Sequence, residues 1–204
     1  VDLVKNLALN DFNIKKLKLT KTMVTDFTPL KGKSIEVIEC EDSKHPIDII
    51  TLKDIEIGTL FMGRSKFINL TDFEHVNTKI LRLTNCGLTE LDFLRGKDFD
   101  YLNLRSNKLV DLNGLRGSRV RKLNLNKNKI LDLSPLENCE LTGELSLKMN
   151  PVSDLTPLKH SKVQVLILRK TKVDDISPLK NLNLFSLDLT DTMVEDLTAL
   201  RNHT

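Results

Sequence analysis

The sequence has few aromatic residues and no long apolar run. It contains no tryptophan, Tyr101 is its one tyrosine, and aromatic residues make up 4% of the 204 residues. Leucine, isoleucine and valine must therefore supply the core. No apolar stretch approaches the ~20 residues that a membrane-spanning helix needs. A net charge of +3 is too small to indicate a nucleic-acid or membrane partner by itself.

The three cysteines, Cys40, Cys86 and Cys139, cannot all pair within one chain and show no metal-ligand spacing. We expect three free thiols, which favours an intracellular location. The sequence begins at Val1 and not at a methionine, so we expect that an N-terminal piece was removed or never included, and a secreted or cell-surface location stays open. Residues 1–16 lack the charged-then-apolar order of a signal peptide.

The clearest pattern is a leucine ladder with a period of 21 or 22 residues, which predicts a stacked repeat array. Each unit has aliphatic residues at positions 1 and 3, an alternation that predicts a short strand with one buried face. Nine such strands, stacked in register, would form a parallel sheet. Their first residues are Leu17, Ile35, Leu60, Leu81, Leu102, Leu123, Leu145, Leu166 and Leu187.

Three further features recur after each predicted strand. Position 6 is a small side chain able to donate a hydrogen bond, which we expect to satisfy backbone carbonyls in neighbouring loops. Positions 8, 11 and 14 are apolar. Many repeats then have an acidic residue followed by Ser or Thr and by Pro, for example Asp175, Ser177 and Pro178. This pattern predicts a short 3₁₀ turn with Ser or Thr as its N-cap. The position-6 residues are Thr22, Cys40, Ser65, Cys86, Asn107, Asn128, Asn150, Thr171 and Thr192.

The second repeat and the two ends are irregular. Ile35 to Leu60 spans 25 residues, which predicts an insertion of about four residues near 40–48, either a tolerated loop or a functional one. Residues 1–16 are expected to form an N-terminal cap or a partial repeat, and residues 17–200 the nine repeats. Residues 201–204 are too short for a cap, so we expect the chain to be cut from a longer protein.

This pattern resembles the leucine-rich repeat family, and the short unit with D-[LI]-[ST]-P-L resembles its internalin-like subclass. Versions with Thr171 in the ladder look like bacterial arrays found alone or attached to serine/threonine kinase domains. The resemblance implies an α/β fold by convention, mostly β in content: a right-handed solenoid with a parallel concave sheet and short 3₁₀ turns on its convex side. It also implies protein recognition on the concave face.

Strand residues that point away from the predicted core lie at positions 2 and 4, with position 5 at the rim. The middle of this face is basic, whereas Glu36, Glu39, Asp188 and Asp191 lie toward its ends. Clustered positive charge predicts a protein or peptide partner of acidic character, although Lys and Arg could simply keep the sheet soluble. The candidate binding residues are Arg82, Tyr101, Asn103, Arg105, Asn124, Asn126, Lys127, Lys148, Arg169 and Lys170.

No arrangement of residues indicates catalysis, so we expect no enzyme, no cofactor, no metal and no small-molecule substrate. The four histidines lack ligand spacing, and there is no Walker, G-x-S-x-G, HRD or DFG motif. A nucleic-acid partner is disfavoured because one aromatic residue on the face gives little stacking. Two alternatives remain: a regulatory or spacer segment of a longer, kinase-like protein, and a weak binder of acidic polymers.

Overall fold

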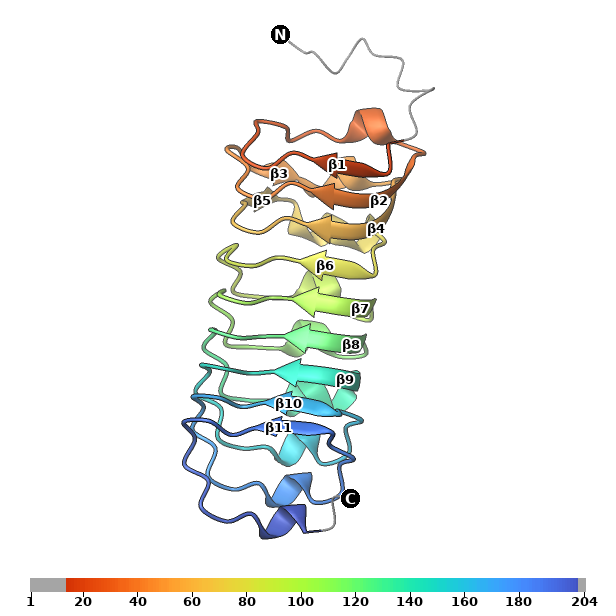
Figure 1. Ribbon diagram of the computed structural model, residues 1–204. Coiled ribbons are helices and arrows are strands. Elements are labelled where there is room, and N and C mark those ends of the chain that lie inside the picture. Colours follow the sequence, from red (N-terminus) through yellow and green to blue (C-terminus); the bar gives the residue numbers. More distant parts are fainter. Residues whose placement is uncertain (1–13, 202–204) are drawn as a thin grey trace. The chain divides into compact units, whose positions relative to one another are not determined.

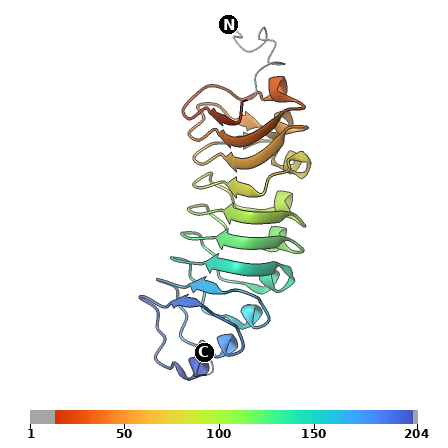
Figure 2. The same cartoon turned by 45° about the vertical axis from the view of Figure 1, so that its right-hand side comes forward.

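The computed structural model describes residues 14–201, which fall into two compact units divided between Cys86 and Gly87. Figures 1 and 2 show that, in each unit, the strands form one layer and the 3₁₀ turns another. Most of the expected N-terminal cap, residues 1–13, and most of the expected tail, residues 202–204, lie outside the described residues.

The first unit contains a parallel sheet with the strand order β1-β2-β4-β6 and a separate two-stranded sheet of β3 and β5. The strands of the larger sheet are β1 (Lys16–Lys18), β2 (Ser34–Glu39), β4 (Glu56–Phe61) and β6 (Ile80–Arg82); those of the smaller are β3 (Ile47–Asp48) and β5 (Phe67–Ile68). The 3₁₀ turns are η2 (Thr28–Leu30), η3 (Ile49–Leu52) and η4 (Leu70–His75).

The second unit contains a parallel sheet with the strand order β7-β8-β9-β10-β11. Its strands are β7 (Asp98–Asn103), β8 (Arg119–Asn124), β9 (Glu140–Ser146), β10 (Val165–Ile167) and β11 (Ser186–Asp188). Its turns are η5 (Asp92–Leu94), η6 (Asn113–Leu115), η7 (Ser134–Asn138), η8 (Thr156–Leu158), η9 (Ser177–Leu179) and η10 (Thr198–Leu200). The predicted fold class, mostly strand with parallel pairing and short 3₁₀ turns, is confirmed.

The ladder leucines form the core because strand register stacks them directly. In the second unit Leu102 pairs with Leu123, Leu123 with Leu145, and Leu145 with Leu166, and none is more than 1% exposed. Burial of each such side chain stabilises the fold by about 1.5–3 kcal/mol. A further apolar column, which the sequence analysis did not assign, precedes the ladder and includes Ile35, Ile57, Phe99, Val120, Leu141 and Val163, all buried.

The predicted phase of the second repeat is wrong. Ile38 pairs with Leu17 on one side and with Leu60 on the other, so Ile38 and not Ile35 occupies position 1. Cys40 consequently takes position 3, where it is 1% exposed, instead of the polar position 6. Ile35 belongs to the apolar column that precedes position 1, and its sequence pattern resembles that of a position-1 residue. Cys40 stands where most repeats have leucine at position 3, so the leucine pattern is lost at the correct phase.

The corrected phase also changes the expected insertion. Ile38 follows Leu17 by 21 residues and precedes Leu60 by 22, close to the spacing elsewhere. The backbone N–H of Ser43 donates to the hydroxyl of Ser65, and Ile47 pairs with Phe67. Ile47 follows Ser43 by four residues, whereas Phe67 follows Ser65, the partner of Ser43, by two. The loop between Ser43 and Ile47 is therefore longer than its counterpart in the next repeat by two residues, and not by the predicted four.

The 3₁₀ turns begin at the predicted places, but the carboxylate supplies the cap. Ser134, Thr156 and Ser177 are the first residues of their turns and are not N-caps. Instead the aspartate two residues earlier accepts a hydrogen bond from the first backbone N–H, as Asp132 does from Ser134 at 2.7 Å and Asp175 from Ser177 at 2.7 Å. The carboxylate thus satisfies a backbone donor that a helical turn leaves without a partner.

We predict that Asp132→Ala lowers stability by about 1 kcal/mol at neutral pH, and by less under acidic conditions. The N–H of Ser134, followed by its hydroxyl, holds the pKa of Asp132 below its usual range. A lowered folded-state pKa contributes stability above the unfolded pKa of about 3.9, and that stability is lost as pH falls through the folded value. Urea unfolding at about pH 7 and about pH 2.5 measures the difference; an equal loss at both pH values would contradict this role.

Candidate functional site

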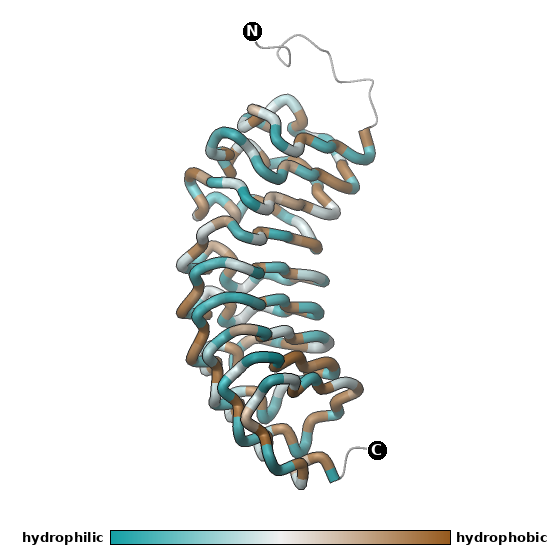
Figure 3. Tube along the Cα trace, turned by 60° about the vertical axis from the view of Figure 1, so that its left-hand side comes forward, coloured by the Kyte–Doolittle hydropathy of each residue, from teal (hydrophilic) through white to brown (hydrophobic). Residues whose placement is uncertain are grey.

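The outward face of the second unit's sheet carries nine of the ten predicted binding residues. Position-2 and position-4 side chains alternate with the buried leucines, so they project from the face opposite the core. Tyr101, Asn124, Asn126, Lys148 and Arg169 are half-buried, and Arg105, Lys127 and Lys170 are exposed. Asn103 is 8% exposed, so it is packed into the face and does not project from it. Figure 3 shows hydrophilic and hydrophobic segments recurring in successive turns of the chain.

After each strand of the repeats, the residue at position 5 has a left-handed backbone conformation with positive φ. In the second unit these residues have φ between 56° and 60°, and they are Ser106, Lys127, Met149, Lys170 and Asp191. None is β-branched, which fits a backbone conformation that β-branched side chains rarely adopt. The kink turns the chain sharply from the sheet face toward the loop, and it holds Lys127 and Lys170 at the rim.

A ladder of position-6 asparagines fixes this turn from inside. Asn128 donates through Nδ2 to the carbonyls of Leu104 and Leu125 at 3.1 and 2.8 Å, and its Oδ1 accepts from the N–H of Leu109 at 3.1 Å. Asn150 repeats the pattern one step along, with Leu125, Leu147 and Ile130. The sequence prediction of a polar brace at position 6 agrees with these bonds.

The asparagines of the outward face have structural bonds of their own. Asn103 accepts from the N–H of Arg105 at 3.0 Å and donates to the hydroxyl of Tyr101 at 2.8 Å. Asn124 accepts from the N–H of Asn126 at 3.0 Å, and Asn126 accepts from the hydroxyl of Ser146 at 2.7 Å. These bonds order the backbone before the rim. The cationic side chains are therefore the groups on this face with the most capacity for a partner.

The cations of this face have few acidic neighbours. Within residues 87–201, no ion pair within 4.0 Å is recorded for Arg105, Lys127 or Lys148. Arg169 and Lys170 share Asp191, but at 4.0 and 3.9 Å these contacts are too long for hydrogen bonds. The Nε of Arg169 is buried with no hydrogen-bond partner. Asp188, at position 2 of β11, has its pKa lowered first by the hydrogen bonds from Thr190 and then by the nearby charges of Arg169 and Lys148. Asp188 and Asp191 therefore offset part of the positive charge at the β11 end of this face, whereas Arg105 and Lys127, toward β7 and β8, form no ion pair within 4.0 Å among residues 87–201.

Arg82 is the tenth predicted residue, and it belongs to the first unit, where it is engaged by other side chains. Its Nη1 lies 3.3 Å from Oε1 of Glu41, and its guanidinium carbon lies 4.2 Å from the centre of the Phe61 ring. Glu41 also pairs with Arg64 at 3.5 Å, and Arg64 pairs with Asp42 at 2.6 Å. The two arginines of this network are balanced by the carboxylates of Glu41 and Asp42, so Arg82 has little charge left for a binding partner. Ile38 of the same unit, which by the predicted phase would fall at outward position 4, is fully buried because it occupies position 1.

The sequence analysis missed a row of exposed lysines at position 7, Lys108, Lys129 and Lys172, which lie just beyond the rim of the second unit. The sequence does contain a signal for this row, because lysine recurs at position 7 in three repeats of the second unit.

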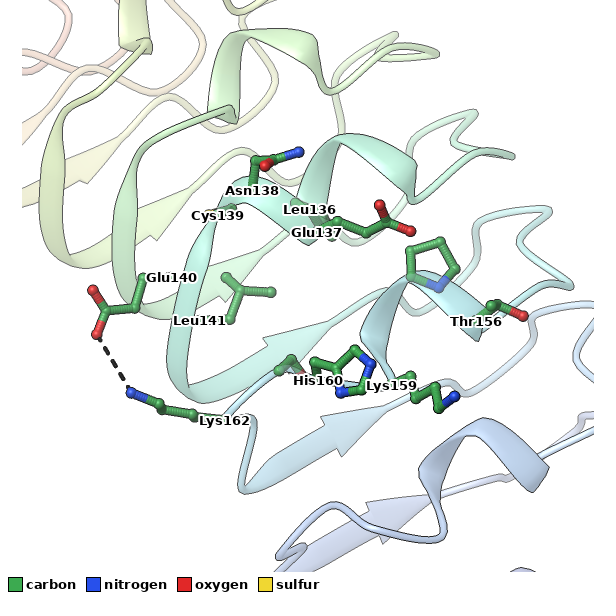
Figure 4. A pocket seen from close by; sticks show the side chains of 12 residues that line it. Leu136, Glu137, Asn138, Cys139, Glu140, Leu141, Thr156, Lys159, His160 and Lys162 are labelled. Atoms are coloured by element: carbon green, nitrogen blue, oxygen red, sulfur yellow. Dashed lines mark ion pairs between the residues drawn. The ribbon is translucent and has the colours of Figure 1, made fainter.

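A depression of about 680 Å³ lies beside η7 and η8, away from the carboxyl ends of the strands (Figure 4). It contains the ion pair of Lys162 with Glu140, at 4.0 Å, and the buried thiol of Cys139. Burial raises the pKa of Cys139 to about 12, so the thiol is protonated at neutral pH and is a poor nucleophile.

Burial likewise raises the pKa of Cys40 to about 12 and that of Cys86 to about 11. All three cysteines are free thiols, as the sequence predicted.

Among residues 14–201, no cluster of three or more metal-ligating side chains is found. In the same described range, no helix has the length and apolar character needed to cross a membrane.

Comparison with known proteins identifies similar solved structures. No protein-family model matches, and no curated protein matches. An internalin (inlF) from Listeria monocytogenes matches over 92% of this chain with 21% identity and a TM-score of 0.61. Internalin C2 (inlC2) from the same species matches over 93% of this chain with 26% identity and a TM-score of 0.65.

This chain spans 64% of the length of the first internalin and 77% of the second. The predicted internalin-like leucine-rich-repeat fold is confirmed by this likeness together with the parallel strands and short 3₁₀ turns. In general terms, the likeness supports a repeat module for protein interaction.

Proposed function

We propose, from the leucine-rich-repeat fold shared with these internalins, that the chain binds an acidic protein or peptide through the outward sheet face of its second unit. The binding residues are the cations Arg105, Lys127, Lys148, Arg169 and Lys170, with Tyr101, Asn124 and Asn126 among them. One observation carries this proposal: five cations follow the ends of the adjacent strands β7, β8, β9 and β10, and three of them form no ion pair within 4.0 Å among residues 87–201.

The spacing of the cations suits an extended acidic partner. Adjacent strands lie about 4.8 Å apart, so cations two repeats apart, such as Arg105 and Lys148, are on the order of 10 Å apart. Two carboxylates on one face of a strand or a helix can match that distance. Because most of these cations are partly or fully solvated, they contribute mainly to the association rate and to selectivity, and the binding should weaken as salt screens the charges.

The test is the affinity of a fluorescein-labelled peptide of repeated Glu-Ser-Glu-Gly units, measured by anisotropy with the full chain. Arg105→Glu combined with Lys127→Glu should weaken binding about tenfold or more at about 0.05 M NaCl, and wild-type binding should fall at about 0.3 M. Both residues are exposed, so the fold should survive the changes.

Lys159→Glu combined with Lys180→Glu is the matched control, because it makes the same charge change at exposed lysines after η8 and η9. Equal weakening by both double variants would mean that net charge alone governs binding, and unchanged affinity for the first would remove this face as the site. Tighter binding of single-stranded DNA than of the peptide would favour a nucleic-acid partner instead.

A further inference from the structure

Lysines occupy position 7 beside the rim of the second unit in the repeats that begin at Leu102, Leu123 and Leu166, and Pro151 holds this position in the repeat that begins at Leu145. The backbone N–H of Lys108 donates to Leu88 at 2.8 Å, that of Lys129 to Leu109 at 2.9 Å, and that of Lys172 to Val152 at 2.8 Å. Each bond joins one repeat to the preceding one at the same place, so the row is held in register. All three side chains are exposed, and within residues 87–201 no ion pair is recorded for any of them.

Two exposed aliphatic side chains lie beside the first two of these lysines. Val110 is 53% exposed and Leu131 is 58% exposed, and each follows its lysine by two residues. The residues between, Leu109 and Ile130, are fully buried. In this extended segment the side chains therefore alternate, and lysine and aliphatic residue share the outward side. We call Lys108, Val110, Lys129 and Leu131 the flank patch.

The flank patch adjoins the cations of the sheet face. Lys127 and Lys129 both project outward from either side of Asn128, whose side chain is 7% exposed and points inward. In the four repeats that begin at Leu102, Leu123, Leu145 and Leu166, positions 4, 5 and 7 hold eight cations and no acid. Positive charge thus continues from the sheet face over the left-handed turn onto the flank.

Acidic residues limit the patch on its far side. Asp111 and Asp132 follow Val110 and Leu131 directly, and each accepts the N–H of the residue two places later, at 2.6 and 2.7 Å. An acidic partner would be repelled beyond this line and attracted toward the rim. This charge pattern sets the direction in which a bound segment can lie, with its acids at the lysines and its apolar side chains at Val110 and Leu131.

We infer that the flank patch extends the binding surface and takes an extended acidic peptide segment that carries aliphatic side chains, crossing the rim from the sheet face. This inference rests on the proposed function of the sheet face. The lysines alone would bind a sulfated polysaccharide as well as an acidic peptide. Burial of the exposed Val110 and Leu131 side chains, however, is favourable only against an apolar group of the partner. The pair therefore favours a polypeptide partner.

The experiment compares two labelled peptides with the full chain: repeated Glu-Leu-Glu-Gly and the matched Glu-Ser-Glu-Gly. Val110→Ser combined with Leu131→Ser should weaken binding of the leucine-containing peptide about three- to tenfold, because apolar burial is lost. The same variant should leave the serine-containing peptide unaffected. Arg105→Glu with Lys127→Glu should weaken both peptides.

The outcomes separate the two claims. If the Val110 and Leu131 variant binds both peptides as the wild type does, the flank inference is overturned while the sheet-face proposal stands. If the Arg105 and Lys127 variant also binds both peptides normally, the proposed function itself fails. A heparin oligosaccharide that competes through Lys108 and Lys129, with no effect of the aliphatic changes, would assign the flank to a polysaccharide and overturn the inference.

Discussion

Asn128→Ala should lower the stability of the protein by about 2–4 kcal/mol, because it leaves a buried backbone donor without a partner. The Oδ1 of Asn128 accepts the N–H of Leu109, a residue that is fully buried. The two carbonyls that its Nδ2 serves keep other donors, since Asn107 also bonds Leu104 and Asn150 also bonds Leu125. The main cost is therefore the N–H of Leu109.

A second substitution tests this explanation by urea unfolding. Asn128→Thr should be nearly as destabilising as Asn128→Ala, although Thr171 at the same position of another repeat shows that a threonine donates to its own repeat's carbonyl, that of Leu168, at 2.7 Å. A threonine keeps that type of bond but does not replace the acceptor for Leu109. The exposed Asn181→Ala serves as the control and should change stability by less than about 0.5 kcal/mol. An Asn128→Thr protein close to wild type in stability would contradict the account, because it would show that the unpaired N–H of Leu109 is not the main cost.

Gly114→Ala should be at least as damaging, with a loss of about 3 kcal/mol or more. A Cβ at Gly114 in η6 would lie 2.0 Å from the carbonyl carbon of Leu91 and 2.6 Å from the backbone nitrogen of Asp92. Backbone atoms cannot rotate aside as a flexible side chain can, so the two stacked turns must separate. That separation would also disturb the packing of Leu112 and Leu115, both fully buried.

Gly117→Ala distinguishes this steric cause from ordinary glycine strain. Gly117 has φ of +74°, and a Cβ there would meet nothing closer than 4.0 Å. Its replacement should cost about 1 kcal/mol, the penalty for a left-handed residue that has a Cβ. Denaturant midpoints and circular dichroism of both variants measure the comparison. A Gly114→Ala protein as stable as Gly117→Ala would show that the turns can move apart at little cost.

The regular repeats were predictable from sequence, and the second repeat shows why one was not. Leucines at positions 1 and 3 identify a strand wherever both are present, as at Leu123 and Leu125. In the second repeat Cys40 replaces the leucine, and Ile35 with Val37 offers a false alternation three residues earlier. Only the pairing of Ile38 with Leu17 and Leu60 resolves the phase.

The candidate surface was predictable in part. Alternation placed Arg105 and Lys148 on the outward face, because a strand has only two faces. It could not show that Asn103 is buried in a bond with Tyr101, or that Arg82 is held by Glu41, because both depend on neighbouring side chains. The left-handed turn at position 5 leaves only a weak sequence signal, the absence of β-branched residues there.

The binding account is tested most directly by amine-reactive footprinting of the lysines, with and without the leucine-containing acidic peptide. The account predicts that peptide binding protects Lys127, Lys148 and Lys170 at the sheet face and Lys129 at the flank, while Lys159 and Lys180 react as before. Equal protection at every lysine, or protection centred on Lys159 and Lys180, would contradict it.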